Sequence, residues 1–277
     1  MKITHCVFLI SIFILSACPV HSYEGTIEHL QVTSNKLSIA ESSANREVSV
    51  YLPDGYESSS KRYPVLYLLH GGWWMGLDNT VFLGKGYNGH LIEANAPKIS
   101  DNLIRKGNIK PMIIVIPHIS TKKPPSAPIY FPMVSDYLTK EIIPLIDRKY
   151  RTISSRKGRA ISGHSDGADG AVFVAVSHPD LFSSVGAYAG VGLQIQGIDA
   201  KELLDSYDKK KHPLNFWVYV GQNDQYGNLS PTRKFITLLE SDNILHTYIE
   251  DIGDHNSMIA QRLEESMVFF SEKMTMD

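Results

Sequence analysis

Eight short β-like segments alternate with stretches of helical character from residue 23 onward. Residues 65–69 and 112–116 are nearly unbroken apolar runs, as expected for strands that are covered on both faces. Such alternation predicts an α/β domain with a mostly parallel central sheet flanked by helices. The expected strands are residues 26–33, 47–52, 64–70, 112–117, 159–162, 184–189, 215–220 and 246–250.

Apolar residues at helical spacing occupy several of the intervals between these strands. One stripe consists of Val134, Leu138, Ile142 and Leu145, and a second of Phe235, Leu238 and Leu239. Residues 257–273 are typical of a final amphipathic helix. The chain contains no internal repeat and no long Pro/Gly/Ser linker, so we expect residues 23–277 to form a single domain.

Composition and charge exclude several classes of protein. The 277 residues are 43% apolar, 10% aromatic and 20% charged, which rules out collagen-like, low-complexity and disordered chains. There are 27 basic and 29 acidic residues, and the net charge is −2. No block of five or six like charges occurs, and nothing indicates a nucleic-acid partner.

Both cysteines, Cys6 and Cys18, lie in the first 18 residues. Residues 1–22 have the parts of an export signal: a basic start at Lys2, an apolar run over residues 6–15, and small residues after it. The run is about ten residues long, against the roughly 20 that a membrane-spanning helix needs. We therefore expect an export signal, and a folded domain without a thiol for a disulfide, a nucleophile or a Cys-ligated zinc site.

Two cleavage sites fit this signal. Residues 15–18, Leu-Ser-Ala-Cys, resemble a bacterial lipobox, in which Cys18 is lipidated and becomes the new N-terminus. Cleavage after Ser22, with Val20 and Ser22 as the small residues, is the alternative. We favour lipidation, which predicts a cell-envelope lipoprotein that meets the membrane only through this anchor. The alternative predicts a periplasmic or secreted protein.

Residues 163–167, Gly-His-Ser-Asp-Gly, match the G-x-S-x-G pattern. The pattern follows the expected strand at 159–162 and precedes a small, apolar helical stretch at 168–176. This is the strand–turn–helix setting of a nucleophile elbow, in which glycines allow a tight turn and the helix N-terminus directs amides toward an oxyanion. We expect Ser165 to be the nucleophile and the neighbouring His164 to contact the substrate.

A serine nucleophile needs a base, which in an α/β-hydrolase follows the nucleophile and the acid along the chain. His178, His212, His246 and His255 are the histidines after Ser165. His255 lies in a polar turn between the last expected strand and the last expected helix. That position favours His255 as the base.

The base needs an orienting carboxylate on the loop after an earlier strand. Asp224 follows the expected strand at 215–220 and is the leading candidate. Asp254 ranks second, because side chains of adjacent residues in a turn rarely face each other. Asp251 and Asp242 rank behind it.

An oxyanion hole needs two backbone donors. The strand at 64–70 runs into Gly71-Gly72-Trp73-Trp74, a His-Gly-Gly turn of the kind that supplies one amide in esterases and lipases. We assign the donors to the N–H groups of Gly72 and Asp166. We expect Trp73 and Trp74 to line the acyl or leaving-group pocket, with anchoring of a buried loop as the alternative.

Ordered short motifs run along nearly the whole mature chain: Tyr51-Leu52-Pro53, Gly55-Tyr56, residues 63–71, 101–104, 110–115, 159–163 and 253–256. On these motifs the chain resembles the esterase D-like esterase family of the α/β-hydrolases. That family includes feruloyl and acetylxylan esterases, S-formylglutathione hydrolases, siderophore esterases and mycolyltransferases. The resemblance implies an α/β-hydrolase fold for residues 23–277, and it supports Ser165, Asp224 and His255 as the triad.

The chain departs from that family directly after the nucleophile. Members usually carry an apolar residue there, often Met, followed by two glycines, whereas this chain has Asp166, Gly167 and Ala168. A carboxylate near a developing oxyanion opposes it unless it is turned away or neutralised. We hypothesise that the Asp166 side chain either points into a polar contact or selects neutral or cationic substrates.

Together these features predict an exported serine esterase that acts on small-molecule or carbohydrate-linked esters. A sugar-linked acyl ester is preferred on the resemblance alone, and no metal or organic cofactor is implied. Acyl transfer to an acceptor other than water would use the same residues. A catalytically inactive surface binding protein is a rival of another class, motivated by Asp166. The sequence leaves the oligomeric state open.

Overall fold

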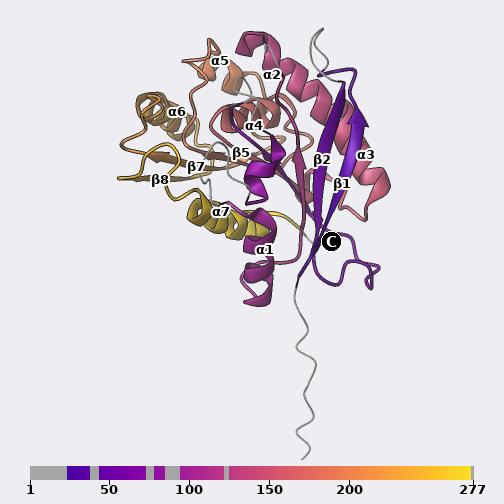
Figure 1. Cartoon of the computed structure of the whole chain (residues 1–277). Helices are drawn as coiled ribbons and strands as arrows, with labels where there is room; N and C mark the ends of the chain where they lie inside the picture. Colours follow the sequence, from indigo (N-terminus) through magenta and orange to yellow (C-terminus); the bar gives the residue numbers. More distant parts are fainter. Residues whose placement is uncertain (1–23, 38–43, 73–77, 85–93, 122–124, 276–277) are drawn as a thin grey trace, which may run out of the picture.

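The computed structural model describes residues 24–37, 44–72, 78–84, 94–121 and 125–275. Its centre is an eight-stranded sheet with the order β1-β2-β4-β3-β5-β6-β7-β8 (Figure 1). The strands are β1 (Thr26–Thr33), β2 (Asn45–Leu52), β3 (Val65–Leu69), β4 (Ile113–Pro117), β5 (Arg159–His164), β6 (Ser184–Tyr188), β7 (Asn215–Gly221) and β8 (His246–Asp251). The β2 strand is antiparallel to β1 and β4, and all other neighbours are parallel. The predicted mostly parallel α/β sheet is confirmed.

The central strands are buried on both faces, as their continuous apolar sequences predict. In β3, Val65, Tyr67 and Leu69 belong to one buried cluster, whereas Leu66 and Leu68 belong to the other. Successive side chains of a strand point to opposite faces, so an unbroken apolar run supplies both core layers at once.

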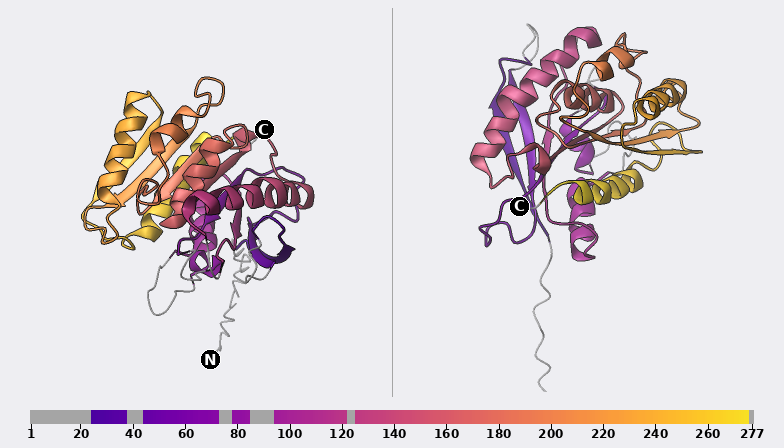
Figure 2. Two further views of the ribbon diagram at one scale, coloured as in Figure 1. Left: turned by 90° about the horizontal axis from the view of Figure 1, so that it is seen from above. Right: turned by 180° about the vertical axis from the view of Figure 1, so that it is seen from behind.

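Helices cover the two faces unequally. The helices α1 (Ala96–Arg105) and α7 (Ile259–Lys273) pack on one face, together with the 3-10 turn η1 (Asn79–Phe82). The other face is covered by α2 (Ala127–Asp136), α3 (Ile143–Lys149), α4 (Asp166–Ser177), α5 (Ala200–Asp205) and α6 (Leu229–Ser241). Figures 1 and 2 show the two helical layers on either side of the twisted sheet. A second 3-10 turn, η3 (Arg156–Gly158), leads into β5.

One expected helical residue is placed differently from the prediction. Val134, Leu138 and Ile142 are fully buried, but Leu145 is partly exposed and Ile146 is buried instead. A π-helical turn, η2 (Tyr137–Ile142), joins α2 to α3. A π turn contains more residues than an α turn, so the residues after it are rotated relative to a regular α-helical stripe.

All eight expected strands are present, and their ends differ from the expected ones by no more than two residues. The carboxyl ends of the parallel strands β3 to β8 meet at one edge of the sheet. Loops at this edge carry the expected site residues, as is general for open α/β sheets. None of the helices in the described part of the chain is long and apolar enough to cross a bilayer.

Candidate active site

Ser165 occupies a sharp turn between β5 and α4. Its backbone dihedrals are φ 55° and ψ −126°, and a positive φ is unfavourable for a residue with a Cβ. The turn is held in place by two backbone contacts: the Ser165 N–H donates to the Tyr188 carbonyl at 2.9 Å, and the Ser165 carbonyl accepts the Ala168 N–H at 2.8 Å. The strained backbone projects the serine at the carboxyl edge of the sheet, which is the geometry of a nucleophile elbow.

The two glycines of the pattern are required by close backbone contacts. A Cβ on Gly163 would lie 2.2 Å from the Gly167 carbonyl oxygen, and a Cβ on Gly167 would lie 2.3 Å from the Leu69 carbonyl oxygen. Any side chain at either position would force the strand, the turn and the helix apart. Glycine therefore allows β3, β5 and α4 to meet closely beneath Ser165.

Three side chains from three distant segments form one hydrogen-bonded row. The Ser165 Oγ lies 2.8 Å from His255 Nε2, and His255 Nδ1 lies 2.7 Å from Asp224 Oδ2. Asp224 follows β7 and His255 lies between β8 and α7. Asp254, the second-ranked acid, instead accepts hydrogen bonds from the Asn256 and Ser257 N–H groups and caps the turn.

The Asp224 carboxylate is enclosed and held by several donors. Its side chain is fully buried, its Oδ1 accepts the Tyr226 N–H at 2.9 Å, and its Oδ2 faces His255. Burial disfavours the charged form, but the hydrogen bond and charge of His255, with the Asn228 and Tyr226 N–H groups, outweigh it and lower the pKa of Asp224. An ionised carboxylate here can orient the imidazole and stabilise its protonated form.

The loops that carry Asp224 and His255 are bound directly to each other. The Gln222 N–H donates to the Asp251 carbonyl at 2.6 Å, and the Asn223 N–H donates to the Gly253 carbonyl at 3.0 Å. A Cβ on Gly221 would lie 2.1 Å from the same Gly253 oxygen, so only glycine permits this approach. The spacing between the two side chains is thus set by main-chain contacts.

The two residues that follow Asp224, Gln225 and Tyr226, also contact His255. The His255 N–H donates to Gln225 Oε1 at 3.2 Å. The Tyr226 ring is 4.5 Å from the His255 ring in an edge-to-face arrangement, and Tyr226 is 57% exposed. Tyr226 therefore offers an aromatic surface beside the imidazole at the opening of the site.

His164, expected from the sequence to contact substrate, is 3% exposed. Its Nε2 donates to the His255 carbonyl at 3.2 Å, and the two rings are 5.1 Å apart. Burial, together with the charge of His255, lowers the pKa of His164 to about 3. A neutral, enclosed ring in this position supports the backbone at His255.

The glycine turn after β3 packs against Ser165. A Cβ on Gly71 would lie 2.8 Å from the Ser165 Cβ, and Gly72 has φ +62°, in the left-handed region that favours glycine. Asp166 is the first residue of α4, so its N–H has no acceptor within that helix. Trp73 and Trp74, the expected pocket residues, lie outside the described residues, as does Cys18.

The Asp166 side chain takes part in a polar contact. The Gln196 Nε2 donates to Asp166 Oδ1 and to Asp169 Oδ2, each at 3.0 Å. Asp169 is buried, and its Oδ1 accepts the Gly192 N–H at 2.7 Å. Burial raises the pKa of Asp169 to about 8, with a smaller contribution from the charge of Asp166, while the Gly192 N–H opposes the shift. One amide thus bridges two carboxyl groups beside the elbow, as the first form of the Asp166 hypothesis predicts.

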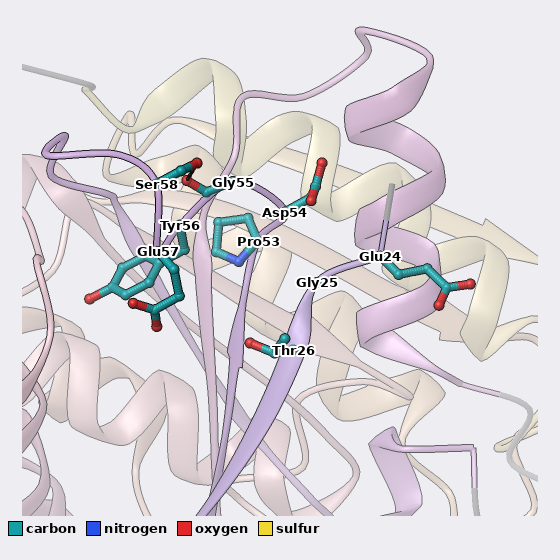
Figure 3. A pocket seen from close by; sticks show the side chains of 9 residues that line it. All are labelled: Glu24, Gly25, Thr26, Pro53, Asp54, Gly55, Tyr56, Glu57 and Ser58. Atoms are coloured by element: carbon teal, nitrogen blue, oxygen red, sulfur yellow. Dashed lines mark hydrogen bonds between the residues drawn. The ribbon is translucent and has the colours of Figure 1, made fainter. Parts of the chain in front are cut away.

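A surface hollow lies at the other end of the sheet (Figure 3). It is lined by residues 24–26 and 53–58, around the start of β1 and the end of β2. Because β2 is antiparallel to β4, with Tyr51 paired to Ile114, the end of β2 lies near the amino ends of the parallel strands. The hollow is therefore remote from Ser165 and is not part of this site.

Three side chains at the site had not been singled out from the sequence: Gln196, Gln225 and Tyr226. The last two directly follow the expected acid, so their proximity to His255 could have been inferred once Asp224 was chosen. Gln196 lies in a loop after β6 without any periodic pattern, and nothing in the sequence connects it to Asp166.

Comparisons with known proteins identify the family of this chain. A family model described as Putative esterase matches residues 40–258, most of the chain. An endo-1,4-beta-xylanase/feruloyl esterase of Xylanibacter ruminicola is 28% identical over 177 residues, which cover 61% of this chain and 23% of that protein. The chain covers 23% to 29% of the length of the curated relatives it matches.

Solved structures show the same fold. A ferulic acid esterase superposes with a TM-score of 0.73 at 22% identity, covering 91% of this chain and 100% of the other. A ferulic acid esterase from Anaeromyces mucronatus, in complex with ferulic acid, gives 0.68 at 24% identity, covering 94% and 93%. On the family match and the fold together, the chain belongs to the Putative esterase family and has the α/β-hydrolase fold.

Proposed function

We propose that this chain is a serine esterase that hydrolyses carboxylic esters through an acyl-enzyme intermediate. Ser165 is the nucleophile, His255 the general base and acid, and Asp224 the residue that orients His255. The continuous row from Ser165 Oγ through the His255 ring to Asp224 Oδ2, starting at a strained elbow, carries this proposal.

In the acylation step, Ser165 Oγ attacks the carbonyl carbon of the ester while its proton passes to His255 Nε2. The tetrahedral intermediate then collapses, the bond to the alcohol oxygen breaks, and His255 returns the proton to the departing alcohol. Asp224 keeps Nδ1–H of His255 in place, so that Nε2 remains the proton-accepting nitrogen.

In the deacylation step, water attacks the acyl-Ser165 ester with His255 again as the base, and Ser165 leaves with the proton. Both tetrahedral intermediates place a negative oxygen between the Gly72 and Asp166 N–H groups. Removal of one such donor costs about 2.7–4 kcal/mol of transition-state stabilisation. The α4 N-terminus adds a favourable dipole at this oxygen.

We propose an aromatic acyl group linked to a sugar as the substrate class. Two similar proteins are named as feruloyl or ferulic acid esterases. In this chain, the exposed Tyr226 ring beside His255 provides an aromatic surface at the site opening. Trp73 and Trp74, which follow the described Gly72 in the sequence, are proposed to line the acyl or leaving-group pocket.

We also propose that residues 1–22 are an export signal, with lipidation at Cys18 favoured over cleavage after Ser22. The support is the order of a basic residue, an apolar run and a lipobox-like segment. The enzyme would then work in the bacterial cell envelope. The intact mass of the mature protein distinguishes a diacylated Cys18 from a new N-terminus at Tyr23.

Hydrolysis of p-nitrophenyl acetate and methyl ferulate by the purified protein tests the proposed activity. The wild type should release acid from both esters, and Ser165→Ala should release none above the rate in buffer. Product analysis with added alcohols separates hydrolysis from acyl transfer, since a transferase would yield new esters. A folded wild-type protein that hydrolyses neither ester would instead support a binding function.

A further inference from the structure

His70 is a fully buried histidine at the end of β3, directly before the glycine turn. Its Nδ1 lies 2.9 Å from the Gly71 carbonyl oxygen, and its Nε2 lies 3.0 Å from the backbone nitrogen of Ile119. Ile119 follows β4, so the ring links the glycine turn to the neighbouring strand. The mechanism above assigns no role to this side chain.

Only one tautomer of His70 can make both contacts at the same time. A carbonyl oxygen can only accept and an amide N–H can only donate, so Nδ1 carries the proton and Nε2 carries the lone pair. Burial, together with the charges of His118 and Arg46, lowers the pKa of His70 to about 3, although the Gly71 contact opposes the shift. The ring is therefore neutral and fixed in orientation at neutral pH.

This contact also fixes the direction of the next N–H group. In a planar trans peptide the carbonyl of one residue and the N–H of the next point in opposite directions. The Gly71 carbonyl is held toward the His70 ring, on the side of β4 where Ile119 lies. Since β3 lies between β4 and β5, a Gly72 N–H that points away from the His70 ring is expected on the β5 side, where Ser165 follows the strand.

We infer that His70 is a positioning residue of the oxyanion hole: its ring binds the Gly71 carbonyl to the Ile119 amide and thereby turns the Gly72 N–H toward Ser165. This inference rests on the proposed esterase function and deepens it. The close packing of Gly71 against Ser165 is consistent with it, because a small rotation of the Gly71–Gly72 peptide would move the donor relative to the nucleophile.

Three substitutions separate the two contacts of the ring. His70→Asn places an amide nitrogen at the position of Nδ1 and can still donate to the Gly71 carbonyl. His70→Gln reaches the position of Nε2, where its oxygen can accept the Ile119 N–H, but it leaves the Gly71 carbonyl without its donor. His70→Leu fills the space and makes neither contact.

Steady-state kinetics with p-nitrophenyl acetate and inhibition by phenylboronic acid are the measurements. Boronate forms a tetrahedral adduct on Ser165 whose oxygen occupies the oxyanion hole. We expect kcat to fall about 10- to 100-fold in His70→Leu and His70→Gln, with KM within about threefold of wild type. The boronate inhibition constant should rise by a similar factor, and His70→Asn should lose less than about fivefold in kcat.

His178→Leu is the control, because His178 is a histidine outside the site that is only partly buried. It lies at the carboxyl end of α4, with its Nε2 2.8 Å from Ser135 Oγ. This variant should change thermal stability without changing kcat. Equal losses in His70→Asn and His70→Leu, or a raised KM with unchanged kcat and boronate inhibition, would overturn the inference. Where His70→Leu does not fold, the other two variants decide the outcome: His70→Gln should lose more kcat than His70→Asn, and the reverse would overturn the inference.

Nuclear magnetic resonance of ¹⁵N-histidine-labelled wild-type enzyme gives a test without disruption of the fold. The ring signal that disappears in His70→Asn should show a protonated Nδ1 and an unprotonated Nε2 at pH 7. A protonated Nε2 contradicts the inference while leaving the esterase proposal intact. A wild type that neither hydrolyses esters nor binds boronate overturns both.

Discussion

The Nε2 atom of His255 lies 2.8 Å from the Oγ of Ser165, although 90 positions separate the two residues in the chain. The contact depends on β5, which ends in the elbow, and on the loop between β8 and α7 at the same edge of the sheet. Main-chain hydrogen bonds between the Asp224 and His255 loops fix its geometry.

Asp224→Asn should lower kcat about 10³- to 10⁴-fold, because an amide that donates to Nδ1 favours the wrong imidazole tautomer. Asp254→Asn is the matched control, since its amide oxygen can still accept the Asn256 and Ser257 N–H groups. Its kcat should remain close to the wild-type value. Similar losses in both variants, measured with p-nitrophenyl acetate, would remove Asp224 from its assigned role.

Gly167→Ala and Gly170→Ala should have opposite effects on stability, although both glycines lie in α4. A Cβ on Gly167 would overlap the Leu69 carbonyl at 2.3 Å, and we expect a loss of about 1–3 kcal/mol or more in the free energy of unfolding. A Cβ on Gly170 would meet its nearest neighbour at 3.7 Å, so alanine there should add about 0.5–1 kcal/mol. Urea unfolding of the two variants measures both, and a stable Gly167→Ala would contradict the close packing of the elbow.

His164→Gln should weaken the dependence of stability on acid. The native pKa of His164, about 3, is below its ordinary value of 6.5, so between these pH values the unfolded chain binds the additional proton. Stability that is present above pH 6.5 is therefore lost as the pH falls toward 3. Glutamine does not titrate. The unfolding free energy of His164→Gln should therefore fall less steeply than that of the wild type between pH 6.5 and 5, by up to about 1.4 kcal/mol per pH unit. Equal slopes for variant and wild type would show that the His164 imidazole is not held neutral by burial.

Asp166→Met tests whether the carboxylate selects among substrates. Two unit charges about 4 Å apart in water interact by about 1 kcal/mol, or about fivefold in rate. The variant should therefore gain kcat/KM for esters that carry a carboxylate, relative to neutral esters, and lose it for cationic esters. Unchanged ratios among the three substrates would contradict substrate selection by Asp166 and leave only its contact with Gln196.

Much of the fold and of this arrangement could be predicted from local sequence. The strands could be located because apolar runs such as residues 65–69 have to fill both faces of a sheet. The position of the elbow followed from two glycines around Ser165, and the positions of Asp224 and His255 from the ends of later strands. In each case the signal lies within a few residues of the feature that it predicts.

The remainder depends on contacts between distant segments. The π turn at Tyr137–Ile142 moves Leu145 out of the buried stripe, and its hydrogen bonds have no pattern in single-residue hydropathy. The bridge from Gln196 to Asp166 and Asp169 joins a loop to a helix 27 to 30 residues away. The burial of His164 behind His255 likewise arises only when β5 and the loop that carries His255 are brought together.

Covalent labelling with a fluorophosphonate tests the central claim most directly. The probe reacts with a serine that an adjacent base activates, and the labelled peptide can be mapped by mass spectrometry. We predict one adduct, on Ser165, that is absent in Ser165→Ala and forms far more slowly in His255→Asn. No adduct on the folded wild type, or an adduct that persists in Ser165→Ala, would contradict the assignment of Ser165 as the nucleophile.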